Sequence, residues 1–331
     1  KRGNDLLSLK HENHNIGKYI YDYILRKNKI PTIDTIDANY YIQIIYGYLI
    51  AVIIKEIITK YKPTSIVCLD NVYLEGILFE LAKDLKIEGI TGINVNRIYF
   101  HLYDDYESYN QHCRTPDDYI LKKYIENKND EMNAVNQYLS KRYSGLDPQH
   151  DAIRAFSPEK KRYEKDQLES LYKLDGLREN ILILPHIFQD APHAYPATIF
   201  ADYFHWLKYT LDILDNSREY NIIIKEHPSA ILYGENGFLE AFIQRNDYQN
   251  VKILDPGINT YSLHQIANYM ITCGGTAGME FAAAGVKVIL ASKPPYADYG
   301  IATIAKDPQE YESILKNLNS IPDVNRDQRT T

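Results

Sequence analysis

Two clusters of polar residues follow apolar runs in the C-terminal half of the chain, and both carry groups that can bind a phosphate. The run Ile222 to Ile224 ends in Lys-Glu-His-Pro-Ser, residues 225–229. The run Tyr269 to Thr272 ends in Cys-Gly-Gly-Thr-Ala-Gly, residues 273–278. In an open parallel sheet, ligands bind beyond the carboxyl ends of the strands. The two clusters therefore predict a ligand site at one edge of a sheet.

The turn Gly274-Gly275-Thr276 suits an anion. Glycines let the backbone approach a ligand closely and adopt positive φ. The residues from Met279 onward read as a helix, whose free N–H groups and positive dipole end would point at the turn. Thr276 adds a hydroxyl donor. The alternative is a plain strand-to-helix turn, because the sequence matches neither a Walker loop nor a Gly-x-Gly-x-x-Gly fingerprint.

His227 and Pro228 belong to the other cluster. Pro228 ends the strand and restrains His227 to an extended conformation. An imidazole at a strand end can bond a phosphate or a sugar hydroxyl. The alternative for a lone histidine is a satisfied structural role, and a ligand site is therefore inferred only from both clusters together.

Taken together, the clusters resemble a known family. The matching segments are residues 224–228 (Ile-Lys-Glu-His-Pro), 274–280 (Gly-Gly-Thr-Ala-Gly-Met-Glu) and 294–300 (Pro-Pro-Tyr-Ala-Asp-Tyr-Gly). They resemble the nucleotide-binding domain of GT-B glycosyltransferases, in particular the bacterial capsule polysaccharide biosynthesis family that includes the β-Kdo transferases. The resemblance covers residues 180–305 and extends only loosely to the N-terminal half. It implies an α/β chain with two Rossmann-like domains that face each other across a cleft.

The resemblance also implies roles for individual residues. Glu280 would accept hydrogen bonds from adjacent ribose hydroxyls, a geometry that suits a carboxylate; a solvated helix face is its alternative. His227 and the amides of the glycine turn would neutralise charge on the departing nucleotide. The nucleotide-binding residues that we expect are Lys225, His227, Pro228, Ser229, Gly274, Gly275, Thr276 and Glu280. The expected substrate-binding residues are Gln189 and His193.

Three carboxylates at predicted strand ends are candidates for the chemistry itself. Asp190 ranks first because the Gln189-Asp190 segment is similar to that of the family; Asp70 comes second, followed by Glu75. Each could act as general base on an acceptor hydroxyl or, in a retaining route, as nucleophile. An aspartate that only caps a turn is the alternative. The sequence has no Asp-x-Asp pair of the kind that metal-dependent transferases use, so we expect neither a metal ion nor a cofactor.

The donor and acceptor follow from the resemblance. A CMP-activated ulosonic acid, Kdo above all, is the first choice of donor, and a UDP- or GDP-hexose is the second. Two other kinds of function stay open: a nucleotide-sugar epimerase of GT-B fold, and a non-catalytic binding subunit of a capsule-assembly complex. Synthesis of capsule or lipopolysaccharide implies a glycan or lipid-linked glycan acceptor. It also implies a peripheral association with the inner membrane or with a polysaccharide-assembly complex.

Bulk properties agree with a chain of two globular domains. The 331 residues allow two domains of ordinary size, each with its own core. We expect residues 1–175 to form an acceptor-side α/β domain with a helical insertion, and residues 176–331 to form the nucleotide-sugar-binding domain. The net charge of −7 gives no support to a nucleic-acid partner. Three dispersed cysteines fit neither a disulfide framework nor a zinc site, which agrees with a reducing cytoplasm.

Apolar runs alternate with helical patterns along the chain, which is typical of an α/β fold. Asp37 is a candidate N-cap for a long helix from Tyr40 to Tyr61, which Lys62-Pro63 would stop. Its longest apolar run covers about half of the ~20 residues that a membrane-spanning helix needs, so we expect a buried helix. A final helix, residues 308–318, is a candidate to cross back to the first domain. Because Lys1 follows no methionine and the chain opens mid-domain, a trimmed chain that lacks a first strand is a further expectation.

Overall fold

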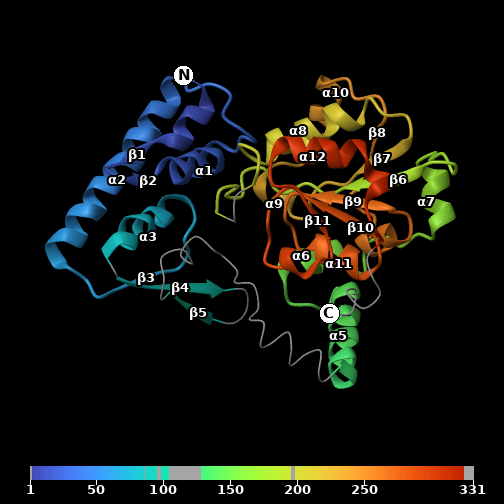
Figure 1. Ribbon diagram of the computed structural model, residues 1–331, viewed down its shortest axis with the longest axis horizontal. Helices are drawn as coiled ribbons and strands as arrows, with labels where there is room; N and C mark the ends of the chain where they lie inside the picture. The colour runs from blue at the N-terminus through green and yellow to red at the C-terminus, as the bar shows by residue number, and fades with distance from the viewer. Residues whose placement is uncertain (1, 86, 95–97, 104–127, 195–197, 324–331) are drawn as a thin grey trace. The chain divides into compact units, whose positions relative to one another are not determined.

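A computed structural model describes residues 2–85, 87–94, 98–103, 128–194 and 198–323 (Figure 1). The chain forms two compact units. Unit 1 comprises residues 1–114 and 188–204, and unit 2 comprises residues 115–187 and 205–331. The expected boundary near Asp175-Gly176 therefore falls inside unit 2. The reason is that the preceding segment pairs with the second half of the chain, as when Lys161 forms a parallel bridge with Ile258.

Unit 1 combines helices with small sheets. Its elements are η1 (Gly3–Ser8), β1 (Lys10–His11), β2 (His14–Asn15), α1 (Gly17–Asn28), α2 (Ala38–Tyr61), β3 (Ser65–Cys68), η2 (Tyr73–Glu75), α3 (Gly76–Ala82), η3 (Lys83–Leu85), β4 (Glu88–Asn94) and β5 (Ile98–Tyr103). Strands β1 and β2 pair antiparallel. Strand β4 pairs with β3 in parallel and with β5 antiparallel. The α/β class is confirmed for this unit, with a sheet smaller than that of unit 2.

Helix α2 begins and ends where the sequence predicts. The Asp37 carboxylate accepts hydrogen bonds from the amides of Asn39 (2.8 Å) and Tyr40 (3.3 Å), and Lys62 ends the helix in a left-handed conformation. The expectation of a buried helix is wrong. Only Gly47, Ala51 and Ile58 are buried, and a stripe of large apolar side chains is exposed. An apolar run gives the length of a helix but not how many of its faces are covered.

The expectation that this segment is too short to span a membrane is also corrected. With 24 residues it is long and apolar enough to cross a membrane by length and composition alone. One such helix is weak support for a membrane span. Within unit 1, α2 packs on α1 at Gly47, where an added Cβ would lie 2.6 Å from the Ile20 side chain. The close approach at this glycine and two hydrogen bonds between Asn28 and Gln43 (2.8 and 3.2 Å) join the two helices.

Unit 2 consists of a central sheet and the helices on its faces. Its helices are α5 (Lys128–Tyr143), α6 (His150–Ala155), α7 (Lys165–Leu171), α8 (Tyr203–Leu214), α9 (Ala230–Tyr233), α10 (Phe238–Arg245), η5 (Thr260–Gln265), α11 (Ala277–Ala283), η6 (Ala297–Tyr299), α12 (Pro308–Lys316) and η7 (Leu318–Ser320). Its strands are β6 (Glu179–Ile183), β7 (Tyr220–Ile224), β8 (Val251–Ile253), β9 (Tyr269–Thr272), β10 (Lys287–Leu290) and β11 (Thr303–Ile304). The apolar runs in this half of the sequence thus correspond to strands.

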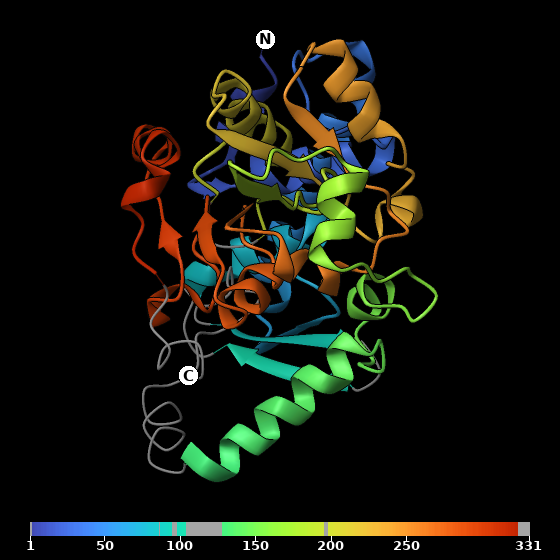
Figure 2. The same ribbon diagram turned by 90° about the vertical axis from the view of Figure 1, so that its right-hand side faces the viewer.

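The six strands of this sheet are all parallel, in the order β11-β10-β9-β6-β7-β8. Numbered along the chain and read from β8, this is the 3-2-1-4-5-6 order of Rossmann-like folds. Figure 2 shows the arrows of β10 and β11 side by side and pointing the same way. The central strands are buried on both faces, which is why they are continuous apolar runs in the sequence. The expected Rossmann-like topology is confirmed for unit 2.

Helices cover both faces of this sheet, with α8 and α12 on one side and α11 on the other (Figure 1). Trp206 of α8 is fully buried, and its indole N–H donates a hydrogen bond to the hydroxyl of Tyr311 in α12 (2.9 Å). Trp206 is therefore a core residue of unit 2. Helix α12 therefore packs on α8 within unit 2, and its crossing back to the first domain stays a prediction.

Candidate functional site

The sheet of unit 2 changes direction between β6 and β9. These strands are neighbours in space, but the chain leaves β6 toward β7 on one side and continues from β9 toward β10 on the other. In open α/β sheets, ligands bind outside the carboxyl ends of the strands at such a switch point. His186 lies just after β6, and Gly274 lies just after β9. The topology therefore brings these two residues together at the expected binding edge.

A hydrogen bond joins the two strand ends. The amide of Gly274 donates to Nε2 of His186 over 3.1 Å. Because Nε2 accepts, the proton of the neutral ring belongs on Nδ1. Desolvation and the nearby His227 lower the pKa of His186 to about 3, although Asp151 opposes them. At neutral pH the ring at the switch point is therefore uncharged.

His227 follows β7 and belongs to a second short network. Its Nδ1 accepts a hydrogen bond from the amide of Ser229 (3.2 Å), and the Ser229 hydroxyl donates to Asp151 of α6 (2.5 Å). Burial lowers the pKa of His227; Asp151 opposes this shift, and Lys225 adds to it. The ring is thus neutral with its proton on Nε2. That N–H is available as a donor to a ligand oxygen.

Close packing makes glycine necessary at position 274. An added Cβ there would lie 2.3 Å from the hydroxyl oxygen of Ser292, which itself donates to the carbonyl of Cys273 (2.9 Å). The carbonyl of Gly275 accepts a hydrogen bond from the hydroxyl of Tyr296 (2.6 Å). Ser292 and Tyr296 therefore fix the conformation of the glycine turn through hydrogen bonds to its backbone carbonyls.

The helix after the turn is short. Helix α11 has seven residues, and Thr276 precedes it with an exposed side chain that forms no capping bond. A helix of two turns aligns few peptide dipoles, so its dipole adds little to anion binding. The Thr276 hydroxyl and the backbone amides of the turn are the donors that this segment offers.

Glu280 is neither solvated nor free. Its buried carboxylate pairs with the guanidinium of Arg142 in α5, which also donates to Gln149 (2.7 Å) and lies 3.5 Å from Asp147. Burial raises the pKa of Glu280, and Arg142 opposes the shift. The alternative of a solvated helix face is therefore wrong. A bond from Glu280 to a ribose stays a prediction, and it would have to share the carboxylate with Arg142.

The remaining expected residues of unit 2 flank His227. Lys225 is 2% exposed, and its ammonium group contacts that of Lys160. Pro228 is half-buried. Four residues of the neighbourhood were not predicted from the sequence, namely Arg142, Asp151, Lys160 and His186. His186 had a usable signal, since it comes two residues after the apolar run Ile181 to Leu184 and directly after a proline.

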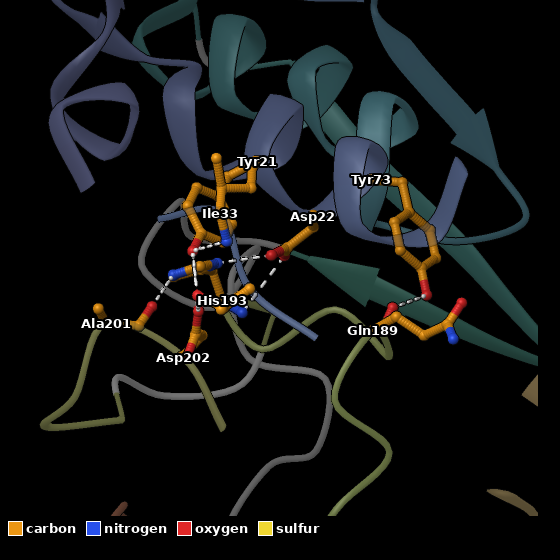
Figure 3. Close-up of polar contacts among 9 residues, drawn as sticks. Tyr21, Asp22, Ile33, Tyr73, Gln189, His193, Ala201 and Asp202 are labelled. Carbon is orange, nitrogen blue, oxygen red and sulfur yellow. Dashed lines mark hydrogen bonds and ion pairs between the residues drawn. The ribbon is translucent and has the colours of Figure 1, made fainter. Parts of the chain in front are cut away.

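The other expected residues all lie in unit 1. The hydroxyl of Tyr73 donates to the carboxylate of Asp190 (3.2 Å). It also approaches the carbonyl of Gln189 (3.4 Å), as Figure 3 shows. Asp70 is exposed and accepts from the amide of Asn71 (2.8 Å), the turn-capping contact that is its alternative role. Glu75 is exposed at the end of η2. The sequence assigned Asp190 to the C-terminal domain, whereas the segment 188–204 belongs to unit 1.

His193 links the segment 188–204 to α1. Its Nδ1 lies 2.5 Å from the carboxylate of Asp22, and its Nε2 lies 2.7 Å from the carbonyl of Ala201 (Figure 3). Two acceptors require protons on both nitrogens. Burial lowers the pKa of His193, but the Asp22 carboxylate outweighs it, so the pKa is raised. A substrate-binding role for His193 stays a prediction that would require one of these bonds to open.

A second carboxylate strengthens this attachment. Asp202 accepts hydrogen bonds from the hydroxyls of Tyr21 (2.8 Å) and Thr32 (2.6 Å), and the Tyr21 hydroxyl in turn accepts from the amide of Ile33 (3.2 Å). Among the residues that the structure describes, no group of three histidine, cysteine, aspartate or glutamate side chains could hold a metal ion.

Neither a protein-family model nor a curated protein sequence matches the chain. Among solved structures, the Thermosulfurimonas dismutans protein KpsC, a beta Kdo 2,4 transferase, is similar at 12% identity and a TM-score of 0.43, over 80% of this chain and 85% of that one. The Methanocaldococcus jannaschii UDP-GlcNAc 2-epimerase is similar at 12% identity and a TM-score of 0.36, over 93% of this chain and 85% of that one.

A third similar structure is the wall teichoic acid polymerase TagF, at 16% identity and a TM-score of 0.32, over 55% of this chain and 43% of that one. This chain thus covers less than half of the polymerase. At such identities and TM-scores, function has to be argued from the residues of this chain, because one fold hosts many activities.

Proposed function

We propose that the chain is a glycosyltransferase of bacterial surface polysaccharide synthesis, of GT-B type, which transfers a sugar from a nucleotide donor to a glycan or lipid-linked glycan acceptor. The observation that carries the proposal is the hydrogen bond between Gly274 and His186 at the switch point of a six-stranded parallel sheet. This hydrogen bond, together with His227 after the neighbouring strand β7, supports a nucleotide site at the carboxyl ends of the strands of unit 2.

The site offers neutral and cationic groups to a departing nucleotide. In the proposed reaction His227 donates its Nε2 proton in a hydrogen bond to a phosphate oxygen, and the amides of the Gly275-Thr276 turn do the same. Donors that are already oriented stabilise the negative charge that develops on the leaving group. Since these groups can supply this stabilisation, we propose that transfer needs no metal ion and that activity survives EDTA.

The acceptor would be activated by a carboxylate, and Asp190 is the first candidate. Asp190 would remove the proton of an acceptor hydroxyl, whose oxygen then bonds to the anomeric carbon as the bond from that carbon to the phosphate oxygen breaks. The Tyr73 hydroxyl bonds to Asp190 and would orient it. This role requires Asp190 to reach a donor bound in unit 2, and Asp70 and Glu75 are the next candidates.

The donor that we propose first is CMP-Kdo or a related CMP-ulosonic acid. The resemblance of the His-Pro and Gly-Gly-Thr segments to the β-Kdo transferase family supports it. A UDP- or GDP-hexose is the second choice. For a lipid-linked acceptor, a location in the cytoplasm with peripheral attachment to the inner membrane belongs to the same proposal.

Product analysis tests the activity. The chain is incubated with each donor and a glycan acceptor, and the products are separated by chromatography and mass spectrometry. Free nucleotide together with a new glycoside supports a transferase. Hydrolysis of a UDP-sugar with inversion at one sugar carbon indicates the epimerase instead. Binding of a nucleotide without turnover of any donor indicates a non-catalytic assembly subunit.

A further inference from the structure

Three cationic side chains gather near the ends of β7 and β8 in unit 2. Lys225 is the first residue after β7, and its buried ammonium group contacts that of Lys160. Arg154, in the last turn of α6, lies close enough to repel Lys160 electrostatically. The Nε atom of Arg154 is buried without a hydrogen-bond partner. We name Arg154, Lys160 and Lys225 the cation cluster.

The backbone holds the cluster in place. The amide of Lys161 donates to the carbonyl of Gly257 (3.0 Å), and the amide of Asn259 donates to the carbonyl of Lys161 (2.9 Å). The side-chain amide of Asn259 also donates to the carbonyl of Ser157 (3.1 Å). These hydrogen bonds hold the segment after α6 against the loop after β8. They therefore keep the backbone of Lys160 close to Lys225.

The cluster carries more positive charge than its surroundings balance. Within the described ranges, none of its three side chains forms an ion pair or donates a hydrogen bond to an oxygen. Asp255 acts on both lysines electrostatically, but it is exposed and its carboxylate accepts from the amide of Gly257 (2.6 Å). Burying cations without partners is unfavourable. Such an arrangement is typical of a site whose counter-charge comes from a ligand.

The protonation of the lysines agrees with this interpretation. Desolvation and repulsion from Lys160 lower the pKa of Lys225 to about 7, although Asp255 and Glu226 oppose the shift. Desolvation also lowers the pKa of Lys160, and Arg154 adds a small repulsion, whereas the hydrogen bond with Lys225 and the charge of Asp255 oppose the shift. A bound anion would reverse both effects. Binding would then draw a proton onto the cluster near neutral pH.

We propose that the cation cluster is a subsite for a phosphate group, next to His227. A guanidinium can hold two phosphate oxygens at once, and ammonium groups add point charges. The Lys225 ammonium lowers the pKa of His227, so the two positions are close in space. The proposal rests on the proposed function for the source of the phosphate, which is either the nucleotide donor or a phosphorylated acceptor glycan.

Calorimetric titration of the full chain with inorganic pyrophosphate tests the subsite. The variants Lys160→Gln and Arg154→Gln each remove one positive charge, and Lys161→Gln is the matched control because Lys161 is exposed and its ammonium group lies over the ring of Tyr163. We expect pyrophosphate affinity to fall at least about tenfold in the first two variants and to stay unchanged in Lys161→Gln. Equal affinity in all three variants, or no binding to the unaltered chain, overturns the subsite.

Two further measurements, of proton uptake and of melting temperature, distinguish a binding role of the cation cluster from a structural one. Titrations near pH 7 in buffers of different ionisation enthalpy should report proton uptake on binding, which Lys225→Met should abolish. In phosphate-free buffer, Lys160→Gln should raise the melting temperature, since it removes repulsion between neighbouring cations. A lowered melting temperature together with absent proton uptake would mean that the cluster serves the fold instead.

Nucleotides identify the source of the phosphate. If CMP affinity falls with pyrophosphate affinity in Lys160→Gln, the subsite takes the phosphate of the donor. If CMP affinity is unchanged while pyrophosphate affinity falls, the subsite takes a phosphate of the acceptor. If nucleotides bind the unaltered chain and pyrophosphate does not, the subsite is wrong and the proposed function stands. If no nucleotide binds at all, the proposed function fails whatever pyrophosphate does.

Discussion

The amide of Gly274 donates a hydrogen bond to Nε2 of His186 over 3.1 Å, and this bond joins the carboxyl ends of β9 and β6. The two residues are 88 positions apart in sequence. The strand order of the sheet makes them neighbours, and the missing side chain at position 274 lets the backbone come close. The junction fixes the tautomer of the imidazole at the binding edge.

Gly274→Ala should lower both stability and nucleotide affinity. The added Cβ would lie 2.3 Å from the Ser292 hydroxyl, which is fixed by its bond to Cys273. We expect a loss of about 1–3 kcal/mol in the free energy of unfolding, measured by urea denaturation. The double variant with Ser292→Ala should recover part of it. Gly176→Ala is the control, because its Cβ would meet nothing within 4 Å; an equal loss there would contradict the close-packing argument.

Stability should fall in acid through His186. Its pKa is about 3 in the folded chain and 6.5 in the unfolded one, so the unfolded state binds more protons between these values. The free energy of unfolding therefore decreases as the pH falls from 6.5 to 3, by at most about 1.4 kcal/mol per pH unit for one such group. His264, with its pKa lowered to about 4, acts in the same direction.

Glu226 opposes this trend, because its pKa is raised to about 7 and the folded state binds its proton between pH 4.5 and 7. The comparison that isolates His186 is therefore the difference between the unaltered chain and His186→Asn, followed by urea denaturation from pH 4 to 7. The difference should change with pH in this range. A constant difference would mean that His186 titrates normally in the folded chain.

Arg142→Met should be strongly destabilising. It leaves the buried carboxylate of Glu280 without its partner, and breaking a buried pair costs about 3–5 kcal/mol. The double variant Arg142→Met, Glu280→Gln should be more stable than the single one, as a thermal or urea denaturation cycle can measure. Lys165→Gln, which breaks an exposed pair with Glu169, should change stability by less than about 1 kcal/mol. Similar losses in Arg142→Met and Lys165→Gln would contradict the burial argument.

Asp190→Asn should remove turnover and keep nucleotide binding. A positioned general base contributes about 10²–10⁴-fold in rate, and asparagine keeps the shape of the side chain while removing its charge. The measurement is initial rate with an accepted donor, beside calorimetric affinity for the nucleotide. Near-normal turnover would move the role to Asp70 or Glu75. A loss of nucleotide affinity would instead make Asp190 a donor-binding residue.

The strands of unit 2 could be predicted because each is a short apolar run closed by a turn. Such runs are easily recognised in a sequence when the strand is buried on both faces. The glycine turn and His227 could be found for the same reason, since strand ends in a parallel sheet share one edge. The exposed face of α2 could not, because periodicity is weak in a helix that is apolar all round.

The other half of the candidate site had no local signal. Arg142, Asp151, Arg154 and Lys160 come from a charged helical stretch in which no motif marks one residue above another. Their positions depend on contacts with residues about 70 to 140 places further along, such as Arg142 with Glu280 and Ser229 with Asp151. The sequence likewise could not reveal that residues 188–204 leave unit 2, because His193 and Asp202 are bound by α1 and the loop after it.

Titration of the full chain with CMP, UDP, GDP and ADP, followed by the same titration of His227→Ala and Thr276→Ala, tests the nucleotide site most directly. One nucleotide, CMP by preference, should bind the unaltered chain, and at one hundred times its dissociation constant it should add about 2.7 kcal/mol of stability. Each variant should weaken that binding at least about tenfold, the loss of roughly one charge-assisted hydrogen bond, while it stays folded and unfolds cooperatively without ligand. No binding by any of the four, or unaltered affinity in both variants, would contradict a nucleotide site at this edge of the sheet.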